Sequence, residues 1–239
     1  MDVPQGADFD FYERYCDDPH GDRGRAGRFD PNKIKEVTAM KIKGHLRMPL
    51  LLTADWSIGG REFSEQAFDE LVADVRSKGV KDILLCGKIL QGPSARNLEL
   101  AAGYLKRIPR KTKVAMVSGT NGEALEMLAE KVPNATYYGE VATLKLGDFT
   151  LMAAYGKYAS SRTIQEVYTK LKIKPNILVM GRFNGMLCEG VPHGRLLIKL
   201  GRDTSRATRH GTTAQLGWHI LHEHDEEHSE IEGRYSRAY

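Results

Sequence analysis

Short apolar runs alternate with amphipathic stretches in the first half of the chain. Between and after these runs, apolar residues recur at helical spacing, and Ser64 and Ser94 are placed to cap the first two of three expected helices. The runs end in polar residues, which is typical of strands buried on both faces; they lie at 49–54, 82–86 and 114–118. This βαβαβα order predicts a largely parallel sheet with right-handed crossovers.

The pattern changes after residue 140. Two apolar stretches, 141–146 and 149–154, flank Gly147-Asp148, which strongly indicates a β-hairpin. Parallel units followed by antiparallel ones predict an α/β fold in which two mixed β-sheets are sandwiched together with flanking helices. The remaining elements expected are a helix at about 162–171 and strands at 176–180, 196–200 and 216–221.

Composition divides the chain into three parts. Residues 1–37 are expected to be a flexible or partner-docking N-terminal extension, because they mix Asp, Gly and Pro with an Arg/Gly-rich stretch at 22–28. A solvated tail is the alternative. Residues 38–224 form the predicted domain, and 225–239 an acidic, His-containing C-terminal tail. The aromatic residues that give the extension something to dock with are Phe9, Phe11, Tyr12 and Tyr15.

Bulk properties exclude several classes of protein. No apolar run approaches the roughly 20 residues of a membrane span, and the acidic N-terminus lacks the order of a signal peptide, so a cytoplasmic protein is expected. Cys16, Cys86 and Cys188 are scattered and form no CxxC pair, and Cys86 reads as a buried core thiol. A net charge of +4 permits contact with nucleic acid or acidic proteins without arguing for it.

Candidate chemistry lies where the predicted strands end, since ligands of α/β sheets bind beyond the carboxyl ends of the strands. The six segments there are TADWSIGG (53–60), CGKILQG (86–92), VSGTNGE (117–123), AAYGKYASS (153–161), VMGRFNG (179–185) and IKLGRDTS (198–205). This series resembles the calcineurin-like metallophosphoesterases, especially the compact phosphodiesterase branch that includes the retromer subunit. That family shows SDxHG, GDxxDG, GNHE or GNxD, HGH, GHTH and NPGS in the same order. The resemblance covers about residues 48–224 and keeps the framing glycines Gly87, Gly92, Gly119, Gly156, Gly181 and Gly201.

The metal-ligand positions of the family are mostly replaced. Asp55 keeps the acid of the first motif, whereas Lys88 stands at the bridging aspartate. The other former metal-site positions carry Ser57, Gln91, Thr120, Asn121, Tyr155, Lys157, Arg182 and Asn184. The family reaction needs two divalent cations that share a bridging carboxylate. A lysine there repels a cation, since two unit charges about 4 Å apart cost about 4 kcal/mol at an effective dielectric of 20. The resemblance therefore implies a pseudoenzyme with no catalytic residue, no metal and no cofactor.

Two arrangements could replace the metals. Lys88 and Arg182 beside Asp55 would form a compensated ionic cluster, which is the favoured interpretation. Alternatively, Lys88, Lys157 and Arg182 make an anion or phosphate site.

Two other polar segments have bland interpretations. His222, His224 and His228 could form a metal site. However, His222 and His224 share a face only in a strand, and His224 and His228 share a face only in a helix. A strand that runs into a solvated acidic tail is the favoured interpretation. The basic run 202–210 could contact phosphates, yet without interleaved aromatics an exposed loop is favoured.

The functional hypothesis is a non-catalytic scaffold or subunit in a larger protein or ribonucleoprotein assembly. The resemblance points the same way, since the retromer subunit uses this fold to dock proteins. A protein partner is expected, with RNA as the other candidate. One rival is a divergent phosphodiesterase that recruits a metal through Asp55, Asn121, Asn184 and the C-terminal histidines. The other is a phosphate- or nucleotide-binding module built on the cationic pocket.

Overall fold

The structure is a computed structural model that describes residues 41–61, 63–155, 175–184, 187–191, 195–202, 217–222 and 231–235. All of them belong to one compact unit of the chain, Lys41–Lys157 together with Lys174–Tyr239. The predicted helix at 162–171 and the extension at 1–37 lie outside these residues.

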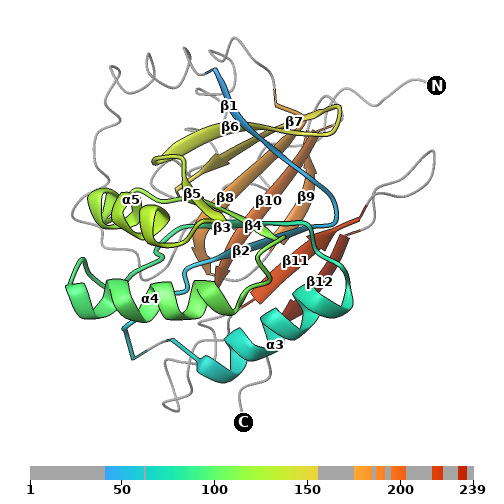
Figure 1. The fold of residues 1–239 in the computed structure, drawn as a ribbon. Coiled ribbons are helices and arrows are strands. Elements are labelled where there is room, and N and C mark those ends of the chain that lie inside the picture. The colour runs from blue at the N-terminus through green and yellow to red at the C-terminus, as the bar shows by residue number, and fades with distance from the viewer. Residues whose placement is uncertain are drawn as a thin grey trace, which may run out of the picture. The chain divides into compact units, whose positions relative to one another are not determined.

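The first sheet is built by the βαβ units that the sequence predicts. Its strand order is β12-β11-β2-β3-β4-β5, with β2 to β5 parallel and β11 antiparallel to both β2 and β12 (Figure 1). The strands are β2 (Leu50–Ala54), β3 (Asp82–Cys86), β4 (Lys113–Val117), β5 (Ala135–Tyr137), β11 (Gly217–Leu221) and β12 (Ile231–Tyr235). Helices α3 (Glu65–Ser77), α4 (Ala95–Arg107) and α5 (Gly122–Lys131) make the crossovers.

The second sheet contains the predicted hairpin. Its order is β1-β6-β7-β8-β10-β9, and β6 pairs antiparallel with β7 around Gly147, which has a left-handed φ of 56°. Only glycine adopts that conformation without a steric penalty, which explains why the turn falls here. The strands are β1 (Ile42–Leu46), β6 (Val141–Leu146), β7 (Phe149–Ala154), β8 (Ile177–Asn184), β9 (Leu187–Val191) and β10 (Arg195–Arg202).

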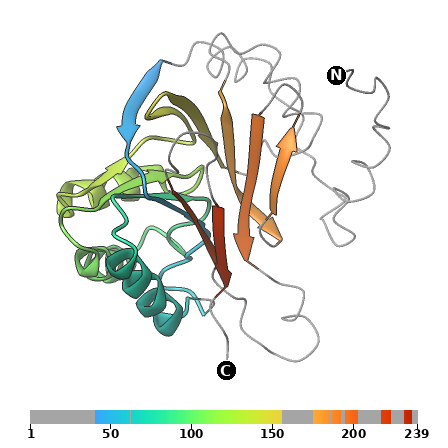
Figure 2. The ribbon, with the colours of Figure 1, turned by 90° about the vertical axis from the view of Figure 1, so that its right-hand side faces the viewer.

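Helices, first sheet and second sheet form three successive layers (Figure 2). Alternate residues of the first sheet supply the two cores: Leu51 and Leu85 pack with the helices, whereas Leu50 and Leu84 pack with the second sheet. Each such fully buried leucine contributes roughly 1.5–3 kcal/mol. The predicted α/β sandwich of two mixed sheets with flanking helices is therefore confirmed.

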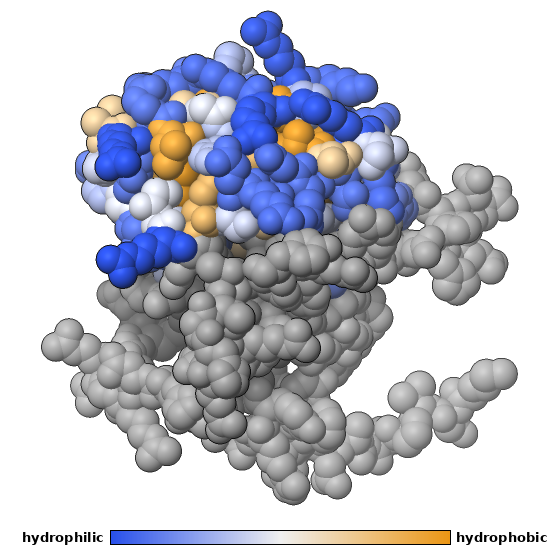
Figure 3. Space-filling model, turned by 90° about the horizontal axis from the view of Figure 1, so that it is seen from below, coloured by the Kyte–Doolittle hydropathy of each residue, from blue (hydrophilic) through white to orange (hydrophobic). Residues whose placement is uncertain are grey.

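The helices are set by their caps and by one apolar face. The Ser64 hydroxyl accepts the Ala67 N–H at 3.2 Å, and the Ser94 hydroxyl accepts the Asn97 N–H at 3.2 Å, as predicted. Phe63, just before the first cap, packs on Phe68 and so fixes the entry of α3. The face over which α3 and α4 lie is mainly hydrophilic, with hydrophobic residues in small separate groups (Figure 3).

The sequence prediction is wrong at the C-terminus. Strand β12 lies inside the stretch 225–239 that was expected to be a tail, and it pairs antiparallel with β11 along its whole length. The sequence IEGRY contains charged residues and a glycine, so it lacks the apolar pattern of a strand. It is a strand because its backbone N–H and C=O groups pair with β11. Strands β1, β5 and β9 were also missed. Among the described residues, no helix is long and apolar enough to cross a membrane.

Candidate functional site at the carboxyl ends of the strands

The first three motifs come together because β2, β3 and β4 are parallel and end at one edge of their sheet. Backbone hydrogen bonds tie the loops beyond that edge: Asp55 N–H donates to the Cys86 carbonyl at 3.1 Å, and Gly87 N–H donates to the Val117 carbonyl at 3.0 Å. Ser57 N–H donates to the Lys88 carbonyl at 3.0 Å. The expected juxtaposition of these motif segments is thus present in the structure.

The loop after β2 holds two residues in the left-handed region, Asp55 with φ 56° and Ser57 with φ 50°. Such residues cost about 1–3 kcal/mol each and persist only where their surroundings enforce them. Trp56 between them is fully buried, and its indole N–H donates to the Thr53 hydroxyl at 3.1 Å. Its ring also meets Phe68 edge-on at 5.3 Å. The buried tryptophan therefore holds the strained loop in place.

Asp55 and Lys88 are joined, but not as a simple ion pair of side chains. The Asp55 carboxylate accepts the backbone N–H of Lys88 at 2.6 Å. The Lys88 ammonium donates to the Gln91 side-chain oxygen at 2.7 Å. Three positions that the resemblance equates with metal ligands are thereby linked by hydrogen bonds around the loop after β3. Arg182, the other predicted member of the ionic cluster, lies on β8, but its side chain is outside the description.

Asn121 caps one helix and contacts the backbone of a neighbouring loop. It is the N-cap of α5 in the left-handed conformation, with φ 58°. Its amide donates to the Leu90 carbonyl at 3.2 Å, which ties α5 to the loop after β3. The Thr120 N–H donates to the Ser118 hydroxyl at 3.2 Å. The amide that sequence reasoning offered as a weak ligand therefore acts as a tie between two loops.

Tyr155 fills space at the position of the family's first HGH histidine. Its side chain is buried, and a Cβ atom on Gly119 would lie 2.6 Å from its ring. Gly181 on β8 is equally close to the first sheet, since a Cβ there would lie 2.7 Å from the Gly87 nitrogen. At these two points the second sheet presses against the ends of the first, so the glycines of the motifs are needed for packing.

Burial of the neighbouring Cys86 confirms the expected core thiol. It is fully buried between the sheets, and this burial raises the pKa of the thiol, with the negative charge of Asp55 adding to the effect. A thiol held protonated is a poor nucleophile and a poor metal ligand.

The described donors do not by themselves complete a site for a pair of divalent ions. Asp55 accepts the Lys88 N–H, Gln91 accepts the Lys88 ammonium, and Ser57, Thr120 and Asn121 offer only hydroxyl and amide groups. A pair of divalent ions needs several carboxylate or imidazole ligands. No group of three or more His, Cys, Asp or Glu side chains converges in the part of the chain that the structure describes.

Several predicted site residues lie beyond the described part. Lys157 is not described, and neither are the side chains of Arg182 and Asn184. His224, His228 and most of the basic run 202–210 are also outside, and His222 is half-buried just after β11. The three-cation anion site therefore stays a prediction.

Sequence reasoning missed one histidine. Both ring nitrogens of His219 on β11 are buried, and neither has a hydrogen-bond partner among the residues that the structure describes. Burial lowers the pKa of His219. Strand alternation could have found it: Trp218 and Ile220 face the helices, so His219 lies on the same face as Leu221, toward the second sheet.

Comparisons with known proteins bear on the fold. No protein-family model and no curated protein sequence matches this chain. Among solved structures, hypothetical protein PH1004 from Pyrococcus horikoshii is similar with a TM-score of 0.50 and 10% identity, covering 80% of this chain and 88% of that one. The fold is shared. Chaetomium thermophilum Vps29 aligns at TM-score 0.45 and 12% identity over 78% of this chain and 94% of its own. Pseudomonas putida nuclease MPE aligns at 0.42 and 13% identity, over 72% and 84%.

Proposed function

We propose that this chain is a degenerate metallophosphoesterase that hydrolyses nothing and serves as a subunit of a larger assembly. One observation carries the proposal: the loop residues at the former metal positions bond to one another. The Asp55 carboxylate accepts the Lys88 N–H at 2.6 Å, and the Lys88 ammonium donates to Gln91 at 2.7 Å. A ligand set used in this way supports a stable loop rather than a reaction.

The surrounding packing supports the same conclusion. Asn121 is engaged with the Leu90 carbonyl, and Tyr155 fills the space beside Gly119. Replacing a ligand by a well-packed or well-bonded residue removes a cost that an empty metal site would otherwise carry, because clustered carboxylates repel one another. The fold is thus kept without the chemistry, which fits a protein used through its surface.

The test is metal content together with hydrolysis. The purified untagged chain is incubated with manganese and zinc, dialysed and analysed for bound metal, and its turnover of bis(p-nitrophenyl) phosphate is measured beside that of Asp55→Ala. We expect a metal stoichiometry near zero and the same background turnover in both proteins. Tightly held ions, or turnover that Asp55→Ala abolishes, would instead support the divergent phosphodiesterase.

The assembly half of the proposal needs its own measurement. A native extract of the cells that make the protein is fractionated by size-exclusion chromatography, and the chain is detected in the fractions by mass spectrometry. We expect it at a mass well above its own 26.7 kDa. Elution as a free monomer under gentle conditions would contradict a subunit role while leaving the metal result untouched.

The anion-binding alternative has a separate readout. If Lys88, Lys157 and Arg182 form a phosphate site, inorganic phosphate or a nucleotide raises the thermal midpoint of the wild-type chain. An unchanged thermal midpoint at millimolar phosphate or nucleotide would contradict the anion-binding alternative.

A further inference from the structure

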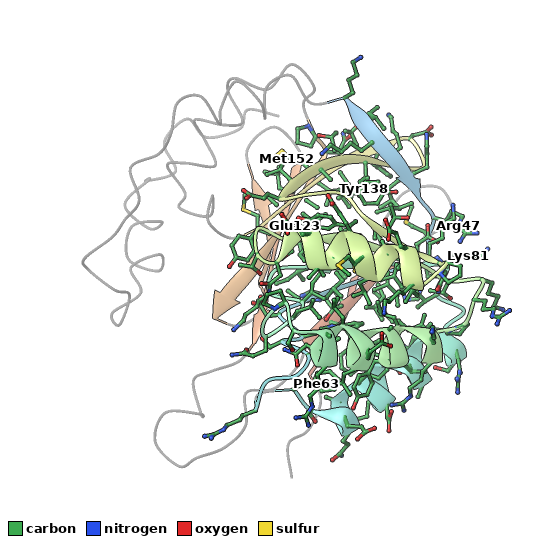
Figure 4. The ribbon with its side chains drawn as sticks, turned by 60° about the vertical axis from the view of Figure 1, so that its left-hand side comes forward. Arg47, Phe63, Lys81, Glu123, Tyr138 and Met152 are labelled. Carbon is green, nitrogen blue, oxygen red and sulfur yellow. The ribbon has the colours of Figure 1, made fainter. Side chains whose placement is uncertain are left out.

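Exposed basic residues gather at the end of the first sheet that is opposite to the candidate site. Parallel strands β3 and β4 begin here, and the connection into β2 passes beside them. We call this set the basic edge; its members are exposed, and they are Arg47, Lys81, Arg110, Lys111 and Lys113. Figure 4 shows Arg47 and Lys81 side by side at this end, with Glu123 at the other end of α5.

Backbone contacts bring the basic edge together from three distant parts of the chain. Lys113 N–H donates to the Lys81 carbonyl at 3.2 Å. The Arg47 guanidinium donates to the carbonyls of Lys81 and Lys111 at 3.1 and 3.2 Å. Arg110 and Lys111 are the central residues of a turn that Thr112 N–H closes on the Pro109 carbonyl at 2.8 Å. The spacing of these cations is therefore set by the fold.

Most of this charge has no structural partner among the described residues. Helix C-termini attract cations, and the last turns of α3, α4 and α5 have their own in Arg76, Lys106, Arg107 and Lys131. The basic edge lies outside the helices. Arg47 pairs with Asp82, which is fully buried. No described carboxylate pairs with Lys81, Arg110, Lys111 or Lys113. These four positive charges are exposed to solvent and repel one another.

The chemistry of the basic edge favours nucleic acid over protein. Protein interfaces are depleted in lysine and centre on buried apolar anchors. The large hydrophobic residues exposed in the described part lie elsewhere, on β1, α4, α5 and β7: Ile42, Leu100, Met127 and Phe149. Clustered lysine and arginine with no exposed large hydrophobic residue among them match phosphate contacts, which position a duplex without reading its bases.

We propose that the basic edge binds the phosphodiester backbone of a nucleic acid. Binding is independent of sequence and falls steeply with salt, because it rests on charge alone. The inference goes beyond the proposed function and uses a different surface. It holds whether or not the candidate site binds metal.

The test compares two triple charge reversals by fluorescence anisotropy with labelled duplex RNA, duplex DNA and single strands. Lys81→Glu/Lys111→Glu/Lys113→Glu reverses three of the five charges of the basic edge and leaves Arg47 and Arg110 in place. The matched control is Lys41→Glu/Arg61→Glu/Arg96→Glu, which changes the net charge equally at other exposed positions. We expect the first variant to weaken binding by about tenfold or more and to reduce the salt slope by about 2–3, since each lost phosphate contact removes roughly 0.9. The duplex and single-strand arms show which form of phosphodiester is preferred.

Three results would overturn the proposal: no binding of any nucleic acid at low salt, equal losses in both triple variants, or displacement of nucleic acid by polyglutamate at equal charge concentration. The last would point to an acidic protein. Unchanged thermal midpoints verify folding, and Lys81→Gln/Lys111→Gln/Lys113→Gln replaces the reversal if that protein does not fold. Neither the anisotropy nor the thermal midpoint depends on metal content. A negative result in this experiment therefore does not contradict the proposed function.

Discussion

Asp55 has a structural role in the loop that follows β2. In the resembling family the aspartate of the first motif binds metal, whereas here its carboxylate accepts the Lys88 N–H at 2.6 Å. The left-handed backbone at Asp55 also suits a short polar side chain better than most others. The acid therefore suits this loop conformation whether or not it has a chemical role.

Asp55→Ala should lower the free energy of unfolding by about 2–3 kcal/mol, through loss of a charged hydrogen-bond acceptor and of a residue tolerant of positive φ. Urea denaturation measures it. Gln91→Ala, at an exposed position, should change it by less than about 0.5 kcal/mol. Asp55→Asn should fall between, because asparagine tolerates this backbone and keeps an oxygen acceptor. A wild-type midpoint that rises with manganese, and loses this rise in Asp55→Asn, would show that the carboxylate binds metal.

His219 makes stability depend on pH. Its pKa is lowered by burial, so the unfolded chain binds more protons than the folded one in the range below the ordinary value of 6.5. The stability of the neutral form is fully present above pH 6.5 and is lost as pH falls below it. His219→Leu should flatten this part of the curve and be neutral or stabilising at pH 7.5, because two unpaired nitrogens disappear. Urea denaturation at several pH values measures the slope, and an equal slope in His219→Leu and the wild type would contradict this prediction.

At the scale of elements, a buried carboxylate joins the connection between β1 and β2 to the start of β3. Asp82 is fully buried and accepts the Arg47 backbone N–H at 2.8 Å as well as its guanidinium at 2.6 and 3.1 Å. Breaking a buried ion pair by removing one partner costs about 3–5 kcal/mol, because the other charge is left uncompensated.

Arg47→Ala should cost about 2–3 kcal/mol, below that range, because Arg47 is about half exposed and Asp82 keeps the backbone N–H. Arg47→Lys keeps the charge without the forked geometry and should recover only part of the loss. Chemical denaturation gives both values, with Lys113→Ala as the exposed control from the neighbouring strand. An Arg47→Ala value as small as that of the control would mean that the pair contributes little.

At the scale of the whole molecule, the two sheets come into close backbone contact at the candidate site. The backbone of Gly87 and Cys86 lies where a Cβ atom of Gly181 would have to go, at 2.7 and 2.9 Å. Backbone atoms cannot swing aside as a flexible side chain can. The motif glycine on β8 thus sets how closely the second sheet approaches the first.

Gly181→Ala should destabilise the chain by about 1–3 kcal/mol through overpacking between the sheets. The same substitution at Gly103, which lies in the interior of α4 with nothing near its would-be Cβ, should stabilise by about 0.5–1 kcal/mol. Thermal or urea midpoints of the two variants should move in opposite directions. Equal shifts would mean that the sheets yield at this point.

Local patterns predicted most elements of the described core. Apolar runs gave β2, β3 and β4 within a residue or two, and Gly147-Asp148 gave the β6–β7 hairpin, because burial on both faces and a left-handed turn leave direct traces in the residue types. The edge strands β1 and β12 contain lysine, glycine and arginine in place of an apolar run. They are strands because a neighbouring strand pairs with their backbone, and backbone pairing leaves no pattern in the residue types. Sequence alone therefore missed both.

The sequence by itself determined the layered α/β fold and the order of the motif segments, since these depend on residue type and on position along the chain. Only the tertiary structure decided what the residues of these segments contact. It showed the Asp55 carboxylate on a backbone N–H, the Lys88 ammonium on Gln91, and a basic edge drawn from residues near 47, 81 and 111. Hydrogen-bond partners and charge clusters depend on which distant segments the fold makes neighbours, and no local pattern records that.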